Sequence, residues 1–265
     1  MHRKPVFSHM EALFLFAAAL LGGALNSVAG GGSFISFPAL VSVGVPSINA
    51  NATNTMALWP GSIASVGAYR AELTRQNGRL VLLLSLTSLL GGLFGAEILL
   101  RTPQATFDRL LPWLMLFAVG IFAVGGNITQ ALRQRFGQRL AAGGILIGLI
   151  VAILQFLISV YGGFFGGGIG ILMLAALALA GMTNIHTMNG LKVLLATLIN
   201  GVAVLRFVIA GTIFWQYAVI MIIGAILGGY GGAAYAQRLE PRVVRRFVIA
   251  VGIAMTVYFF IREYA

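Results

Sequence analysis

Two glycine triplets are the features of this sequence whose type and spacing could support chemistry. Gly30–Gly32 and Gly166–Gly168 each come just before a short apolar segment, which begins at Ser33 or at Ile169. If each segment is a helix, its first N–H groups lack an intrahelical partner and lie at the positive end of the helix dipole. Such an end binds anions without a charged side chain, and glycine lets the backbone approach the ligand closely. The triplets therefore predict a site for a small anion.

Polar residues inside apolar segments are the second source of candidate ligands. Asn51, Thr53 and Asn54 follow the first short segment, and Asn189 and Lys192 follow the second. Polar groups at membrane depth are costly unless they face a cavity or a neighbouring helix. Lys192 could attract an anion, or its own ammonium group could gain and lose a proton. Alternatively, it could extend from a helix end to the membrane interface. Asn51 and Asn54 could instead cap the start of a helix.

Glycines also permit tight packing between membrane helices, and this alternative stays open for both triplets. Under the site hypothesis, the lining consists of backbone from the two turns and polar side chains from the helices that follow. We expect the substrate-binding residues to be Gly30, Gly31, Gly32, Ser33, Asn51, Thr53, Asn54, Gly166, Gly167, Gly168, Asn189 and Lys192.

Other kinds of chemistry find no support in the residue types. The chain has no cysteine, which excludes disulfides, thiol catalysis and thiolate metal sites. Its histidines (His2, His9 and His186) are scattered and match no metal-ligand spacing. No nucleophile–base pair, nucleotide-binding loop or carboxylate pair occurs. An intramembrane enzyme would need such a constellation, so we expect no catalytic residues, no metal and no cofactor.

The elements that must position these residues are membrane helices. The chain has 265 residues, of which 59% are hydrophobic and 9% charged, and its mean hydropathy is +0.97. No Asp, Glu, Lys or Arg occurs between Glu11 and Arg70, or between Arg139 and Lys192. Because about 20 apolar residues span a bilayer, each tract is long enough for more than one crossing. The composition predicts an all-α polytopic membrane protein.

Ten apolar windows divide the chain. They fall at residues 11–30, 33–45, 50–69, 79–100, 107–126, 139–161, 168–181, 188–209, 214–236 and 245–262. Eight are long enough to span a bilayer, and the two short ones, 33–45 and 168–181, follow the glycine triplets. Segments of that length are typical of re-entrant or broken helices.

The order of these elements repeats in the two halves of the chain. Placing the first triplet on the second brings Asn51 onto Asn189 and Asn54 onto Lys192. Chance similarity is the alternative, since membrane proteins are rich in Gly and Leu. We expect two structural repeats of about five helical segments, residues 1–130 and 131–265, each with a short broken helix after its Gly-rich turn. Because five is odd, the repeats should be inverted relative to each other.

The net charge of +11 is concentrated between apolar segments. Clusters occur at Arg70–Arg79, Arg133–Arg139 and Arg238–Arg246, a pattern typical of cytoplasmic loops and not of a nucleic-acid interface. If the short helices cross the membrane, all three clusters face the cytoplasm. The loops at 101–109 and 206–215 then face outside together with both termini. If the short helices turn back, the termini move.

The two glycine-rich tracts resemble the sulfite exporter TauE/SafE family, also called the toluene-sulfonate uptake permease family. The first half has a Gly-rich turn, a short segment containing Pro38, and then Ala50–Thr53. The second half has a Gly-rich turn, Met182–His186 and Asn189–Lys192. The resemblance covers essentially the whole chain. The second half has Leu174 where the first has Pro38, so the two short helices need not share one shape.

The resemblance implies a multi-pass transporter of the bacterial inner membrane that moves small sulfur-containing anions such as sulfite, sulfoacetate or other organosulfonates. Together with the paired turns, it leads us to expect secondary transport by alternating access. An anion channel of the same architecture and a transporter of another small anion, such as a carboxylate, remain alternatives. The expected partners are this substrate and the lipid bilayer, without nucleic acid. The sequence carries no signal for an oligomeric state.

Overall fold

The computed structural model describes residues 8–28, 31–74, 76–136, 144–236 and 241–264, and over these ranges it contains helices and no strands. The helices are α1 (His9–Val28), α2 (Ser33–Ser42), α3 (Ser47–Ala68), α4 (Arg70–Thr74), α5 (Gly78–Arg101), α6 (Gln104–Phe136), α7 (Gly144–Phe164), α8 (Ile169–Leu179), α9 (Ile185–Ile209), α10 (Trp215–Ala236) and α11 (Pro241–Tyr264). The predicted all-α fold is confirmed.

The surface of the bundle is suited to lipid. Large apolar side chains such as Leu13, Leu90 and Ile209 are exposed. By length and composition, α1, α5, α6, α9 and α11 could each cross a membrane, and α2, α7, α8 and α10 contain shorter apolar stretches. A water-soluble protein rarely exposes so much apolar surface. The predicted polytopic membrane protein is therefore confirmed.

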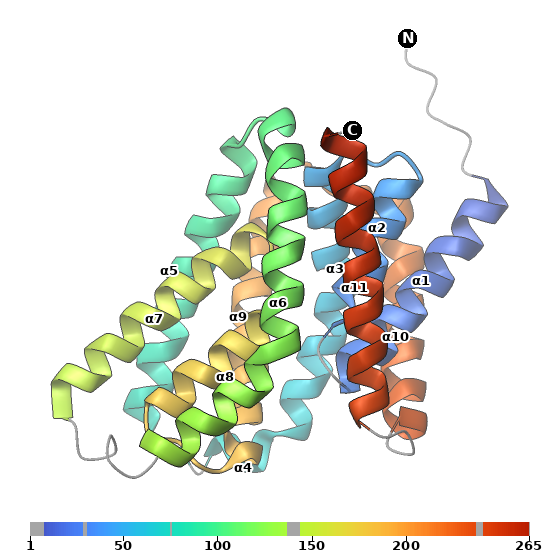
Figure 1. The fold of residues 1–265 in the computed structure, drawn as a ribbon. Coiled ribbons are helices and arrows are strands. Elements are labelled where there is room, and N and C mark those ends of the chain that lie inside the picture. The colour runs from blue at the N-terminus through green and yellow to red at the C-terminus, as the bar shows by residue number, and fades with distance from the viewer. Residues whose placement is uncertain (1–7, 29–30, 75, 137–143, 237–240, 265) are drawn as a thin grey trace.

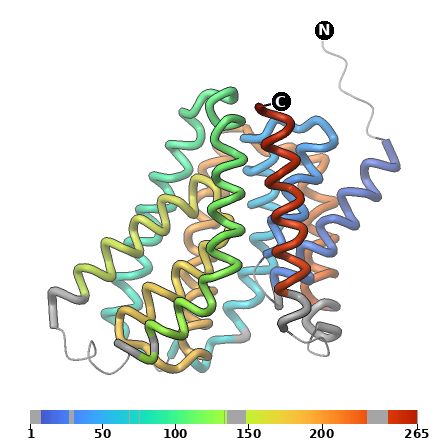
Figure 2. The backbone as a smooth tube through the Cα atoms, in the orientation of Figure 1, coloured from blue at the N-terminus to red at the C-terminus, as the bar shows by residue number. Residues whose placement is uncertain are grey.

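The helices run between two faces of the bundle (Figure 1, Figure 2). The beginning of α1 and the end of α11 lie on one face with the connections at 43–46, 102–103 and 210–214, and we call it the terminal face. The short helix α4 and the connection at 180–184 lie on the opposite face, which we call the α4 face. This grouping of the chain ends with the less basic loops agrees with the expectation from the charge pattern.

The short helices α2 and α8 return the chain to the side from which it came. Helix α1 begins on the terminal face and α2 ends there, while α7 and α8 form a second pair that opens toward the α4 face (Figure 1). Each short helix is therefore the return arm of a helical hairpin, as expected for a re-entrant or broken helix, and it reverses the direction of the chain as a full crossing would. The remaining long helices of each half then run back and forth between the two faces.

Two close helix pairs hold each hairpin against the other half of the chain. Helix α1 packs along α10, and α7 packs along α5. A Cβ on Gly228 would overlap the carbonyl oxygen of Leu20, and a Cβ on Gly95 would overlap that of Val160. Small residues allow this backbone approach, which stabilises helix pairs in lipid. The first helix of each half thus packs on the next-to-last helix of the other half. Inverted repeats would produce this reciprocity, although the repeat itself stays a prediction.

Replacing Gly228 by Ala is expected to lower the thermal unfolding midpoint in detergent. The methyl group would meet the carbonyl of Leu20, a backbone group that moves only if α1 and α10 separate. Overpacking of this kind costs about 1–3 kcal/mol. The matched control is Gly61→Ala in α3, where a Cβ would have no atom within 4 Å. Equal midpoints for the two variants would contradict the close pairing of α1 and α10.

Candidate functional site

The two glycine turns converge on the middle of α6. A Cβ on Gly31 would lie 2.5 Å from Val248 Cγ1 of α11 and 3.5 Å from Phe122 Cζ of α6. A Cβ on Gly167 would lie 3.0 Å from the Cβ of Ala118. Ala118 and Phe122 are four residues apart and therefore share one face of α6. The turns from the two halves thus meet the same helix about one helical turn apart.

The short helices begin where the sequence predicts, at Ser33 and Ile169. Their N-caps are Gly32 and Gly168, and neither helix has a side-chain cap. Gly166 and Gly168 have φ angles of +83° and +76°, a left-handed conformation that glycine adopts at little cost. The glycines of the second triplet are therefore needed to turn the chain. Both short helices therefore begin at a glycine without a side-chain cap, and the N–H of Ile169 donates to the carbonyl oxygen of Gly166 over 3.5 Å.

Gly32 has a packing role in addition. A Cβ there would overlap the carbonyl oxygen of Gly22 in α1, so the α1–α2 hairpin closes only with glycine at this position. The packing alternative raised by the sequence therefore applies to Gly32. Ser33, the next residue, is half-buried. Gly30 lies outside the described residues.

Asn51 and Asn54 tie α3 to the two hairpins. Because α3 begins at Ser47, both asparagines lie inside the helix, which rules out the capping alternative. Asn51 Nδ2 donates to the carbonyl oxygen of Phe164, at the end of α7, over 3.0 Å. Ser36 Oγ of α2 donates to Asn54 Oδ1 over 2.5 Å. Both asparagines are buried, so α3 connects a hairpin of each half.

Replacing Asn51 by Ala is expected to lower the thermal unfolding midpoint in detergent. The carbonyl of Phe164 would lose its donor in a buried place, and an unsatisfied buried polar group costs about 1–3 kcal/mol. The control is Asn127→Ala, because Asn127 is exposed on α6 and has no hydrogen bond among the described residues. A midpoint for Asn51→Ala no lower than that of the control would contradict the bridging role.

Asn189 and Lys192 hold in α9 the places that Asn51 and Asn54 hold in α3. They are the fifth and eighth residues of their helices. Aligning the two glycine triplets therefore pairs residues that occupy the same positions within α3 and α9. Asn189 and Lys192 are half-buried, whereas Asn51 and Asn54 are buried. The equivalent positions thus have more free surface in the second half.

Lys192 is the one cation among the residues expected to bind substrate. Its stem lies along the first turn of α8, where a Cβ on Gly170 would be 3.3 Å from Lys192 Cδ. Within the described part of the chain, its ammonium group has no hydrogen bond or ion pair. An unpaired charge on a membrane helix is costly, and a bound anion would lower that cost. Lys192 therefore lies beside the first turn of α8 without a charged partner among the described residues.

The first turns of α3 also hold the terminal face together. Asn49 Nδ2 donates to the carbonyl oxygen of Thr212 over 2.7 Å, and Phe214 N donates to Thr53 Oγ1 over 3.0 Å. Thr212 and Phe214 both lie in the connection between α9 and α10. Thr53 was expected to bind substrate. Its hydroxyl oxygen instead accepts a hydrogen bond that links the two halves of the chain.

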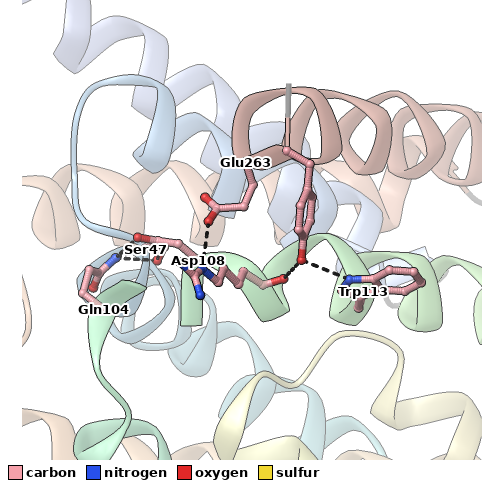
Figure 3. A network of polar contacts seen from close by, with 7 residues as sticks. Ser47, Gln104, Asp108, Trp113 and Glu263 are labelled. Atoms are coloured by element: carbon pink, nitrogen blue, oxygen red, sulfur yellow. Dashed lines mark hydrogen bonds and ion pairs between the residues drawn. The ribbon is translucent and has the colours of Figure 1, made fainter. Parts of the chain in front are cut away.

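A polar network adds further contacts between helices on the terminal face (Figure 3). Ser47 Oγ donates to the carboxylate of Asp108, and Gln104 Nε2 contacts Ser47 Oγ at 2.6 Å and Asp108 Oδ1 at 3.0 Å. Next to Asp108, Arg109 Nε lies 4.0 Å from Glu263 Oε1 of α11. The sequence did not point to this network. The signal that could have found it is an amide and a carboxylate one turn apart at the start of α6.

The part of the bundle nearer the α4 face is more open. From residue 59 to 67, α3 has no buried residue, and a Cβ on Gly61 would meet nothing within 4 Å. On α9, Asn189 and Lys192 are half-buried, whereas Phe207 on the same face is buried. The side of α9 that carries Asn189, Lys192 and Phe207 is therefore more accessible near the α4 face than near the terminal face.

A cavity of about 460 Å³ opens between α6, α8 and the start of α9. Its lining is apolar on α8 and mostly polar on α6, and consists of Gly126, Thr129, Gln130, Gln134, Ile171, Leu174, Thr183 and Ile185. Ile185 shares one face of α9 with Asn189 and Lys192, so the cavity lies at the α4-face end of the same helix surface. None of these lining residues was expected to bind substrate.

Comparison with known proteins places these features in a family. The sequence model of the family described as "Sulfite exporter TauE/SafE" matches residues 15–259. A "Probable membrane transporter protein" of Haemophilus influenzae is 30% identical over 244 residues, which cover 91% of each chain. "Probable membrane transporter protein ORF9" of Sinorhizobium sp is 27% identical, over 92% of this chain and 90% of that protein. "Probable membrane transporter protein YfcA" of Escherichia coli K12 is 27% identical, over 91% and 87%. No solved structure matches this chain. The chain belongs to the sulfite exporter TauE/SafE family.

Proposed function

We propose that this membrane transporter is a secondary transporter of small sulfur-containing anions, such as sulfite, sulfoacetate or other organosulfonates, and that it works by alternating access. The observation that carries the proposal is the meeting of the two glycine turns on α6, with Lys192 unpaired beside the second turn. Two helix N-termini and one ammonium group would surround the anion. The family description and the relatives' names support transport across a membrane.

The proposed ligand chemistry follows from the groups present. A sulfonate or sulfite carries one or two negative charges on three oxygens, and each oxygen accepts hydrogen bonds. The two short helices begin at Ser33 and Ile169, and the helix dipole favours a negative charge at these ends. The glycines place no side chain of their own between the backbone of the two turns and a ligand. Lys192 would add the single full positive charge.

The proposed mechanism uses the difference between the two faces. Hydrogen bonds that Asn49 and Asn51 donate and that Thr53 accepts close the bundle toward the terminal face, whereas α3 and one side of α9 are more open toward the α4 face. This form would admit an anion from the α4 face. Release on the other side would require these α3 bonds to break, which is the movement of one repeat against the other seen in transporters built from inverted repeats.

The proposed orientation places the α4 face in the cytoplasm of an inner-membrane protein. Arg70 begins α4 and Arg79 lies in the first turn of α5, while Arg245 and Arg246 lie in the first turns of α11 on that side. On the terminal face, the acidic residues Glu11, Glu97, Asp108 and Glu263 balance the basic residues Arg101, Arg109, Arg206 and Arg262. Basic residues concentrate in cytoplasmic loops, so the basic side is assigned to the cytoplasm.

The test is a thermal-shift screen of the purified protein against sulfite, sulfate, sulfoacetate, taurine and simple carboxylates. A ligand that binds only the folded state stabilises it by about 2.7 kcal/mol at 100 times its dissociation constant. Selective stabilisation by a sulfite or sulfonate, rising with the logarithm of concentration, is the expected result. Stabilisation by carboxylates alone would favour a carboxylate transporter. No response to any sulfur anion would remove the substrate assignment.

A further inference from the structure

The cavity between α6, α8 and α9 contains a buried hydroxyl group without a partner. Thr129 is 5% exposed, and its Oγ1 makes no hydrogen bond with any residue that the structure describes. A threonine inside a helix ordinarily donates to the carbonyl one turn before it. Buried polar groups are nearly always paired, so an unpaired one in the wall of a cavity points to a partner that binds there.

A positive charge flanks the same cavity. The guanidinium of Arg245 donates to the carbonyl oxygens of Phe122 and Ala123 over 3.0–3.4 Å, and both acceptors are neutral. A Cβ on Gly126 would lie 3.1 Å from Arg245 Nη1, and Gly126 lines the cavity. No carboxylate among the described residues pairs with Arg245, so its charge is not neutralised. Glycine at position 126 is what lets the guanidinium reach this wall.

The remaining lining divides into a polar and an apolar part. Gln130 and Gln134 are exposed on α6 and can donate amide hydrogen bonds, whereas Ile171 and Leu174 of α8 are apolar. No carboxylate occurs in the lining to repel an anion. An anion with a small organic group would therefore place its oxygens toward α6 and its carbon atoms against α8.

We propose that this cavity is a second anion site, which takes small organosulfonates before they reach the glycine turns. Arg245 supplies the attracting charge, Thr129 donates a hydrogen bond to a sulfonate oxygen, and Ile171 and Leu174 contact the organic group. The order of the two sites along the path rests on the proposed function. Anion binding in the cavity does not, because it depends only on the lining and on Arg245.

The absence of cysteine from the chain allows a direct test with one introduced thiol. Gln130→Cys places the thiol in the cavity wall, and Thr74→Cys, on the exposed surface of α4, is the control. Each protein reacts with two methanethiosulfonates that share an ethyl spacer and end in a sulfonate or a trimethylammonium group. The thiolate forms a disulfide with the reagent and releases methanesulfinate. We expect the rate ratio, sulfonate over ammonium reagent, to be about tenfold higher in the cavity than at the control.

Two substitutions of Arg245 separate the effect of its charge on the rate ratio from its effect on the fold. In the Gln130→Cys background, Arg245→Gln should lower the rate ratio to that of the control, whereas Arg245→Lys should keep most of it. An unchanged ratio in the glutamine variant, or no reaction with either reagent at position 130, would overturn the site. If Arg245→Gln does not fold, a control-like ratio in the folded Arg245→Lys protein would overturn it as well.

Protection by ethanesulfonate tests the hydroxyl group and the organic specificity. Ethanesulfonate should slow modification of the Gln130→Cys protein, and Thr129→Val should raise the half-protecting concentration at least about threefold. Equal protection with and without the hydroxyl would overturn the role of Thr129. If the thermal-shift screen detects no sulfur anion but the rate ratio is high, the proposed transport function fails and the cavity site stands. If sulfite stabilises the protein but the rate ratio matches the control, the cavity site fails and the proposed transport function stands.

Discussion

Replacing Lys192 by Met is expected to weaken binding of a small anion by about a hundredfold, with little change in the thermal unfolding midpoint. The ammonium group has no partner among the described residues, so its removal leaves no buried group unsatisfied. Methionine keeps an unbranched stem of similar length against Gly170. A full charge a few ångströms from an anion is worth several kcal/mol where water is partly excluded. Affinity is measured from the ligand dependence of the unfolding midpoint.

The matched control is Lys192→Arg, which keeps the charge and is expected to retain most of the affinity. A methionine variant that binds anions as tightly as the unmodified protein would assign Lys192 to the interface role of a lysine that extends toward water. A methionine variant that loses stability as well as affinity would instead show that the lysine supports the packing of α8 on α9.

Replacing Gly31 by Val is expected to abolish anion binding, a loss of at least about a hundredfold, while the protein remains folded in detergent. The new Cβ would lie 2.5 Å from Val248 Cγ1, a side-chain atom that can move, and the added methyl groups would fill the turn. Gly167→Val should act in the same way in the second half, since its Cβ would lie 2.9 Å from Phe165 Cε1. Gly32 is a poorer test, because a Cβ there overlaps the backbone of α1.

Two controls separate occupation of the site from displacement of α11. Gly120→Val adds the same group on α6 at a place where a Cβ has no atom within 4 Å, and it should bind normally. Combining Gly31→Val with Val248→Ala makes room for the new Cβ, and binding should stay lost if the valine fills the site. Full recovery of binding in the double variant would mean that the turn acts only through packing.

The parts of the fold that could be predicted depend on local signals. Hydropathy marked the helices, and the glycine triplets marked the starts of α2 and α8 because a chain reversal needs residues without side chains. Ion pairs between side chains one helical turn apart were also predictable. Glu97 Oε1 accepts from Arg101 Nε one turn away at 2.8 Å, as expected from their spacing.

Contacts between distant segments could not be predicted, because residue types do not reveal which helices pack together. Arg206 also pairs with Glu97, at 2.8 Å, and only the packing of α9 on α5 brings them together. Gln155 of α7 donates to Ser88 of α5 over 2.9 Å, and the sequence does not identify this partner. The position of Arg245 beside the cavity depends in the same way on the packing of α11 on α6.

Counterflow of sulfite in proteoliposomes measures directly whether the protein transports sulfite by alternating access. Vesicles containing the purified protein are loaded with unlabelled sulfite and diluted into a trace of radiolabelled sulfite. An alternating-access transporter exchanges internal for external anion, so the account predicts a transient accumulation of label above equilibrium and a rate that saturates with concentration. Protein-free vesicles give the background. Label that only equilibrates, with a flux proportional to concentration, would show a channel, and absence of any flux above background would contradict sulfite transport.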